Sequence, residues 1–303
     1  MIKLNKERGI VRIEKLEDIT TMPGFTERID PKRDGHKLKE IIGSYDFDDE
    51  VHCGLPCNQP HNRGYVALTD QGAVILLGNQ CGKRTFGVEF RMFRAAFVRA
   101  INAKERREII ERVRNQLPAL HERVKAIRDA GATRFYTLGQ ALRGQQATAP
   151  ASVRRVLDDL IRTGRVAVMG TRPPTEEERN TFEVANGRKP PPGYEIQIEY
   201  GRLAGLGFFS PDLDLRKLLI DEVEVTLKMV EGVDVEKASD KELAAVARAA
   251  NQLGTKFERI EAAMGYARAF FTQTNLAPLR RLIRGQFEKQ AFQPFWDQLQ
   301  VVG

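Results

Sequence analysis

Three cysteines and two histidines lie close together in the first third of the chain. The group includes every cysteine of the 303-residue sequence and two of its four histidines: His52, Cys53, Cys57, His61 and Cys81. Thiolate and imidazole are ligands that Zn²⁺ prefers in proteins. Clustered cysteines in a chain whose start lacks the apolar stretch of a secretory signal favour metal binding over disulfides. The clustering therefore predicts a zinc site.

Glycine and proline shape the first part of this cluster. Gly54 and Pro56 separate the first two cysteines, so this segment should form a tight knuckle rather than a helix. A knuckle turns its thiolates toward one point, as tetrahedral zinc requires. His52 is an alternative ligand, but its side chain should diverge from that of the adjacent cysteine. We expect one structural Zn²⁺ with four protein ligands and no open position: Cys53, Cys57, His61 and Cys81.

Two strand-like runs and a helix follow the knuckle. Residues 65–69 and 73–77 flank Asp70-Gln-Gly72, which is typical of a β-hairpin. Cys81 comes next, ahead of a helical stretch over residues 89–101. Knuckle, hairpin and a ligand near a helix start resemble the treble-clef class of zinc fingers, over residues 50–100. That class presents two ligands at the helix start, whereas this chain has one cysteine there.

Residues 133–170 read as two helices, a turn and a strand. Thr137 should cap the first helix and Ser152 the second, which Gly164 should end in the left-handed conformation. Strands over residues 165–169 and 194–200 would form a wing, with a proline-rich exposed loop between them. With a basic helix that begins at the Asn102 capping box, this order resembles the winged helix-turn-helix, over residues 103–205.

The winged-helix resemblance implies nucleic-acid contacts at the start of the second helix. Arg pairs bidentately with guanine and Gln with adenine, while Ser and Thr hold phosphates. The expected contacts come from the turn, the second helix and the wing: Gln145, Gln146, Thr148, Ser152, Arg154, Arg155, Arg188 and Lys189. The charge distribution favours an acidic partner, because residues 83–130 hold 13 Lys and Arg against six Asp and Glu. The alternative is a protein-docking module whose arginines are merely solvated.

Apolar residues recur at alternating spacings of three and four near the C-terminus. They form one seam: Leu243, Val246, Ala250, Leu253, Phe257, Ile260, Met264, Ala267 and Phe271. Such a seam serves either a coiled-coil homo-oligomer through residues 243–271 or packing within the chain, and Ala, Phe and Met in the seam favour internal packing. The aromatic residues Phe292, Phe295 and Trp296 either close the helical core or form a docking surface.

The sequence thus predicts a mostly helical, multidomain α+β protein. Its expected parts are a zinc module in residues 1–101, a winged-helix-like middle over 102–208 and a helical bundle over 209–303. Pro118 should kink or split the basic helix, and residues 36–42 should form a short helix. No apolar run is long enough to cross a membrane, and we expect a cytoplasmic protein.

We expect a non-enzymatic, zinc-containing protein that binds DNA. The zinc stretch, with Cys-Gly-x-x-Cys, Gly-Tyr-Val and Cys-Gly-Lys-x-x-Phe-Gly, is also similar to small metal modules of bacterial and phage proteins. The first alternative is an adaptor or inhibitor that docks a protein partner. The second is a zinc hydrolase in which Asp49 or Glu50 acts as base. The deaminase and His-Glu-x-x-His protease patterns are absent from the sequence, so no catalytic residue is predicted.

Overall fold

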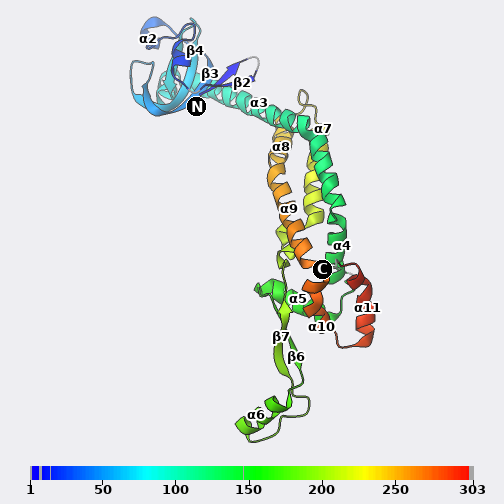
Figure 1. The fold of residues 1–303 in the computed structure, drawn as a ribbon. Helices are drawn as coiled ribbons and strands as arrows, with labels where there is room; N and C mark the ends of the chain where they lie inside the picture. The colour runs from blue at the N-terminus through cyan, green and yellow to red at the C-terminus, as the bar shows by residue number, and fades with distance from the viewer. Residues whose placement is uncertain (1, 7–8, 14, 146, 300–303) are drawn as a thin grey trace. The chain divides into compact units, whose positions relative to one another are not determined.

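The protein is mostly helical with small antiparallel sheets, as predicted (Figure 1). The structure, a computed structural model, describes four stretches of the chain: residues 2–6, 9–13, 15–145 and 147–299. The chain forms two compact units. The first comprises residues 1–114 and 233–248, and the second comprises residues 115–232 and 249–303. Within the described stretches, none of the helices is both long and apolar enough to cross a membrane.

A five-stranded antiparallel sheet with the order β2-β1-β3-β4-β5 forms the base of the first unit. Its strands are β1 (Ile2–Lys6), β2 (Gly9–Ile13), β3 (Leu38–His52), β4 (Pro60–Thr69) and β5 (Val74–Gly78). Two short helices, α1 (Glu17–Thr20) and α2 (Pro31–Asp34), lie in the connection between β2 and β3. The predicted hairpin is present, with Tyr65 opposite Leu77. The whole of β5 is buried, which explains its unbroken apolar sequence.

The long helix α3 (Asn79–Asp129) begins directly after β5. Its side chains Phe90, Phe97 and Ile101 lie in the same core as residues of β4 and β5. The predicted helix start at Asn102 is wrong, because the helical segment that carries these aromatic residues continues through it. Pro118 does not split the helix either. The residue with non-helical dihedral angles inside α3 is Gly87, with φ of 53°.

The predicted helix over residues 36–42 is also wrong. Residues from Leu38 onward belong to β3, in which Leu38 and Ile41 are buried. β3 pairs with β4 along most of its length, with register shifts after Leu38, Ile41 and Asp46. These bulges disturb the two-residue alternation that marks a strand, so the local sequence pattern resembles a helix. Pairing with a neighbouring strand then decides the conformation.

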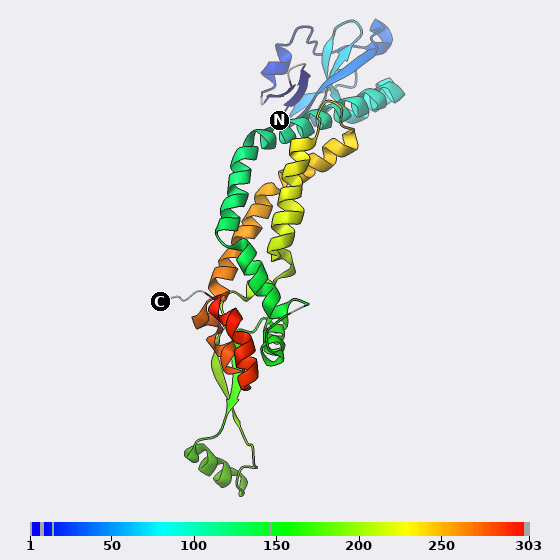
Figure 2. The same cartoon turned by 90° about the vertical axis from the view of Figure 1, so that its right-hand side faces the viewer.

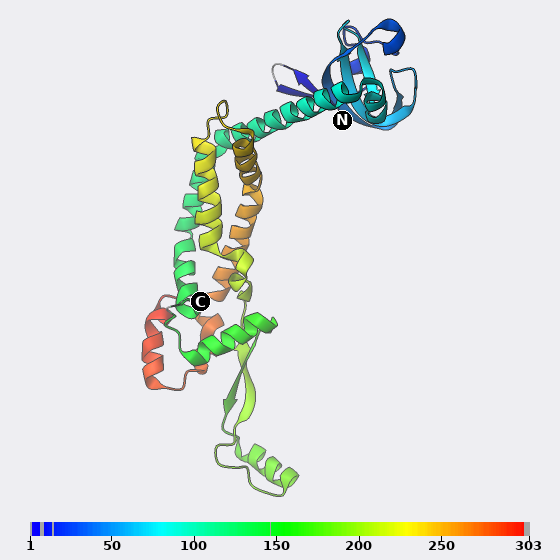
Figure 3. The same ribbon diagram turned by 180° about the vertical axis from the view of Figure 1, so that it is seen from behind.

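The second unit holds the predicted helix-turn-helix region and most of the C-terminal helices. Its first part consists of α4 (Ala132–Arg143), α5 (Ala151–Thr163), β6 (Ala167–Arg172), α6 (Glu176–Asn186) and β7 (Ile196–Arg202). β6 and β7 form a two-stranded antiparallel ribbon, and α6 lies at the end of this ribbon (Figures 1 and 3). The proline-rich segment predicted as a loop therefore contains a helix.

The remaining elements are helical. Two short 3₁₀ turns, η1 (Leu206–Phe209) and η2 (Pro211–Leu213), precede a π-helical segment, η3 (Lys217–Glu224). The later helices follow in chain order: α7 (Val225–Gly232), α8 (Asp240–Asn251), α9 (Leu253–Phe270), α10 (Gln273–Arg281) and α11 (Gln286–Asp297). In the second unit, α7 and α9 run beside the last part of α3 in all views (Figures 1–3). Arg123 of α3 lies over the Phe257 ring of α9, at 4.3 Å from its centroid.

Every residue of the C-terminal seam is buried within the single chain. The seam belongs to two helices, α8 and α9, rather than one, with Gln252 between them. Phe271 stacks on Phe135 of α4 with ring centroids 5.8 Å apart, which ties α4 to the end of α9. This burial supports internal packing. Phe292, Phe295 and Trp296 of α11 are also buried, at 7 % exposure or less, so the expectation that these three form a docking surface is wrong, whereas the fourth aromatic residue of α11, Phe287, is exposed.

Internal packing of the seam predicts the effect of a buried charge. Leu253→Asp should lower the free energy of unfolding by about 3–5 kcal/mol, because the new carboxylate has no partner in this core. Denaturant unfolding and light scattering should show reduced stability with unchanged mass. The control is Thr255→Asp, which adds the same charge at an exposed position of α9. Separation of a dimer into stable monomers by Leu253→Asp would contradict internal packing.

Candidate metal centre and candidate nucleic-acid interface

The three cysteines converge from three elements of the first unit. Cys53 directly follows β3, Cys57 lies in the turn before β4, and Cys81 lies in the first turn of α3. Their Sγ atoms all lie within 4.8 Å of one another, and those of Cys57 and Cys81 are 3.2 Å apart. In a tetrahedral site with Zn–S bonds of about 2.3 Å, the sulfurs are separated by about 3.8 Å. The three thiols could therefore hold a metal ion.

The knuckle between Cys53 and Cys57 is held against the hairpin by backbone hydrogen bonds. The Gly54 N–H donates to the Leu76 carbonyl at 2.7 Å, and the Cys53 N–H donates to the Gln59 carbonyl at 3.1 Å. A Cβ atom on Gly54 would lie only 3.0 Å from the Cβ of Ile75 and 3.2 Å from the Leu76 oxygen. Glycine at this position thus permits the close approach that places the first thiol.

Burial and mutual repulsion oppose ionisation of two of the thiols. Burial raises the pKa of Cys53 against the effect of the Gly78 and Leu55 amides, and burial together with the other thiols raises the pKa of Cys81 to about 12. Burial also acts to raise the pKa of Cys57, but the Gln59 amide, the neighbouring thiols and the Arg84 charge outweigh it, so this pKa is lowered. A cation at the centre would stabilise all three thiolates together.

The structure does not bring either histidine into the thiol cluster. The Nε2 atom of His61 lies 2.6 Å from the Tyr45 hydroxyl, and its Nδ1 lies 3.0 Å from the Gln59 carbonyl oxygen. The Nδ1 atom of His52 lies 3.1 Å from the Asn58 carbonyl oxygen. A side chain that does contact the thiols is Gln59, whose Oε1 accepts from Cys81 Sγ at 3.6 Å. The fourth ligand stays a prediction.

Sequence reasoning missed Gln59, which lies in the turn before β4, and Tyr45, because the contacts of both join residues far apart in the sequence. Tyr45 lies opposite Gly64 in the β3–β4 ladder, so its ring crosses a position without a side chain. A Cβ atom on Gly64 would lie 2.3 Å from the Tyr45 hydroxyl oxygen. A glycine in the middle of a predicted strand is a signal of such a close approach, but it does not reveal the partner.

Helix α5 has a buried and an exposed face. Val153, Leu157 and Leu160 are buried, as predicted, whereas Arg154 and Arg155 are exposed at the N-terminal end. Neither arginine makes an ion pair within the described part of the chain. Two cations at a helix start are therefore available to an outside partner.

The N-terminal caps of α4 and α5 differ from the predicted ones. The N-cap of α5 is Pro150, and Ser152 lies inside the helix with a buried, unpartnered Oγ, so the predicted cap is wrong. Thr137 does not cap α4 either, because the helix begins at Ala132 and the Thr137 hydroxyl donates to the Thr133 carbonyl. Gln145 and Thr148 are exposed in the turn, while Gln146 lies outside the described residues.

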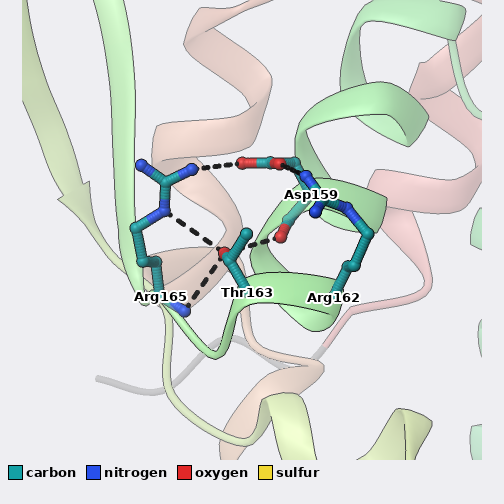
Figure 4. Close-up of polar contacts among 4 residues, drawn as sticks. All are labelled: Asp159, Arg162, Thr163 and Arg165. Carbon is teal, nitrogen blue, oxygen red and sulfur yellow. Dashed lines mark hydrogen bonds and ion pairs between the residues drawn. The ribbon is translucent and has the colours of Figure 1, made fainter.

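A polar cluster fixes the end of α5 against the start of the ribbon (Figure 4). Asp159 accepts from Arg162 at 2.5 Å and from Arg165 at 2.9 Å. The Thr163 hydroxyl donates to the Asp159 carbonyl at 2.7 Å and accepts from Arg165 Nε at 3.2 Å. Gly164 adopts the left-handed conformation with φ of 71°, as predicted. Because these arginines are engaged, they differ from the two at the start of the helix.

The predicted wing residues Arg188 and Lys189 lie at the end of the ribbon, just after α6. Both are exposed and follow Gly187, which ends the helix. The first turn of α6 is acidic, with glutamates at positions 176–178. The two cations therefore share this end of the ribbon with a group of carboxylates, which weakens its attraction for phosphate.

Comparison with protein-family models, with curated proteins and with solved structures finds no match for this chain.

Three thiol ligands predict that the protein binds a metal ion and that Cys57→Ser impairs this binding. The affinity should fall by more than the roughly 10–100-fold that accompanies loss of an outer-shell partner. Elemental analysis of protein purified without chelator should detect about one ion per chain, and the ion should leave as the pH falls, because protons compete for the thiolates. The control is His121→Ala, which changes an exposed histidine of α3 outside the cluster. Metal-free protein that is stably folded would contradict the prediction.

Proposed function

We propose that this chain is a zinc-containing, non-enzymatic protein that binds DNA through α4 and α5. The observation that carries the DNA-binding part is the pair of exposed arginines, Arg154 and Arg155, which form no ion pair within the described residues and lie at the start of α5. The zinc part is supported by the three convergent thiols, since a soft thiolate set favours zinc over magnesium or calcium.

The proposed zinc has a structural role. Its three thiol ligands belong to the end of β3, the knuckle and the start of α3, so one ion would link the sheet to the helix. Two of the cysteines are buried, which leaves little access for a substrate. Structural zinc sites stabilise small modules directly, and they are closed by four ligands. Gln59 or His61 would complete the set.

The DNA-binding proposal follows from the position of α5 between the turn and the ribbon. In helix-turn-helix proteins the second helix enters the major groove with its N-terminal residues against the base edges. Arg154 and Arg155 occupy that position, and Gln145 and Thr148 are exposed in the preceding turn. The buried Ser152 hydroxyl takes no part in the proposed contacts. Asp158 lies one turn later but is paired with Arg143 at 2.7 Å, which partly neutralises it.

The test is binding of random-sequence duplex DNA by the full chain at two salt concentrations. Affinity should fall steeply with salt, because bound cations release counterions from the phosphates. The double variant Arg154→Ala, Arg155→Ala should weaken binding and reduce the salt slope by about two units, one for each phosphate contact that is lost.

Arg268→Ala serves as the matched control, since it removes an exposed arginine of α9 that lies outside the proposed DNA contacts. It should leave the affinity for DNA unchanged. Equal binding by wild type and the double variant at low salt would overturn the proposal and favour a protein-docking role for the same helices. If the chain binds single-stranded DNA or RNA more strongly than duplex DNA, the single strand rather than the duplex is the target.

A further inference from the structure

The sulfurs of Cys57 and Cys81 lie closer together than two ligands of one zinc ion. Their separation is 3.2 Å, against about 3.8 Å for two sulfurs on a tetrahedral zinc. A disulfide needs about 2.0 Å, so a movement of roughly 1.2 Å would join the two atoms. Cys57 lies in the turn before β4, and a turn can adjust more easily than the helix that carries Cys81. The two thiols are therefore positioned for a covalent bond as well as for an ion.

Cys53 differs from Cys57 in its surroundings. It is 1 % exposed, and the backbone amides of Gly78 and Leu55 hydrogen-bond to its sulfur, which holds this thiol in place. Cys57 is only half-buried, and the exposed Arg84 of α3 adds a positive charge near it. A partly exposed thiol near a positive charge is typical of cysteines that react with oxidants. Cys57 is thus the thiol of the cluster that an oxidant reaches first.

We propose that the thiol cluster is also a redox site, at which hydrogen peroxide joins Cys57 to Cys81 in a disulfide while Cys53 stays a thiol. In the first step the Cys57 sulfur attacks a peroxide oxygen, the O–O bond breaks, and a sulfenic acid and one water form. The Cys81 sulfur then attacks the Cys57 sulfur, the S–O bond breaks, and a second water leaves. Two thiols lose two electrons and two protons, and one peroxide is reduced to two waters.

The disulfide and the proposed zinc are alternatives at the same place. Formation of the bond leaves Cys53 as the remaining thiol of the cluster, and one thiolate is too few to hold the ion. The bond joins two elements that the ion would also link, the turn before β4 and the start of α3. Sheet and helix therefore stay connected when the ion leaves. This exchange rests on the zinc part of the proposed function, whereas disulfide formation needs the thiols alone.

The test adds hydrogen peroxide to the full, reduced chain, both as purified and after removal of metal with a chelator. The free thiols should fall from three to one, and dithiothreitol should restore them. Trypsin places Cys53 and Cys57 in the peptide over residues 40–63 and Cys81 in the peptide over 64–83. Mass spectrometry should find these peptides joined, with Cys53 still open to alkylation. A bond between Cys53 and Cys57 would leave the peptides separate and would overturn the inference.

Two variants separate the roles of the thiols. Cys53→Ser keeps both partners of the proposed bond, so it should still form the disulfide and serves as the matched control. Cys81→Ser removes the second attack, so the sulfenic acid of Cys57 should persist and react with dimedone. Dimedone on Cys53 instead would contradict the assignment of Cys57. Circular dichroism checks the fold of each variant, and the peptide map of the unaltered chain decides the pairing without them.

The zinc-loaded chain provides an independent readout. Peroxide should release about one zinc ion per chain to a chromogenic chelator as two thiols are lost. Zinc that stays bound while the disulfide forms would contradict the exchange of ion for bond. Three thiols that survive peroxide at a concentration that oxidises free cysteine would overturn the redox site itself. A chain that takes up no zinc but forms the disulfide would contradict the proposed function alone, so the two failures are distinguishable.

Discussion

The convergence of three thiols is the constraint on which the first unit depends. Cys53 and Cys81 are buried, and the three Sγ atoms lie within 4.8 Å of one another. Thiolates this close repel one another, and burial removes hydration from those of Cys53 and Cys81, so a cation at the centre would stabilise all three in the ionised form. The hairpin, the Gly54 approach and the start of α3 all serve to bring these groups together. A metal ion there would convert mutual repulsion into a link between sheet and helix.

In the second unit, helix α5 combines a buried apolar face with exposed cations at its start. Val153, Leu157 and Leu160 attach the helix to the unit, while the Asp159 cluster sets the direction of the chain into β6. Arginines near the end of α5 are thus engaged in intramolecular contacts. Within the described residues, Arg154 and Arg155 at its start form no ion pair, and this difference within one helix is the basis for proposing an acidic partner. Burial alone would be equally compatible with a purely structural module.

Local patterns predicted the parts of the fold that local chemistry determines. The knuckle residues Gly54 and Pro56, the hairpin, the buried positions of α5 and the left-handed Gly164 follow from side-chain and turn preferences. The inward stripe over residues 243–271 was visible for the same reason, although the break at Gln252 was not. The predicted division into three domains and the predicted DNA contacts stay predictions.

Long-range pairing decided what local patterns could not. The bulges of β3 conceal its strand period, and its pairing with β4 brings the Tyr45 hydroxyl to within hydrogen-bond distance of His61. Helix α6 escaped prediction because proline groups flank it and its stability comes from a cap and the Arg172 contact rather than from an apolar stripe. Where the apolar pattern is weak, the sequence carries little signal of structure.

X-ray absorption at the zinc edge would show directly whether the three thiolates bind a metal ion. The spectrum reports the type, number and distance of the atoms bound to the metal without requiring a functional assay. The thiol cluster predicts three sulfur ligands at about 2.3 Å and one lighter ligand, oxygen or nitrogen, at about 2.0–2.2 Å. A first shell made only of oxygen and nitrogen, or protein purified with reduced thiols that does not take up zinc, would contradict it.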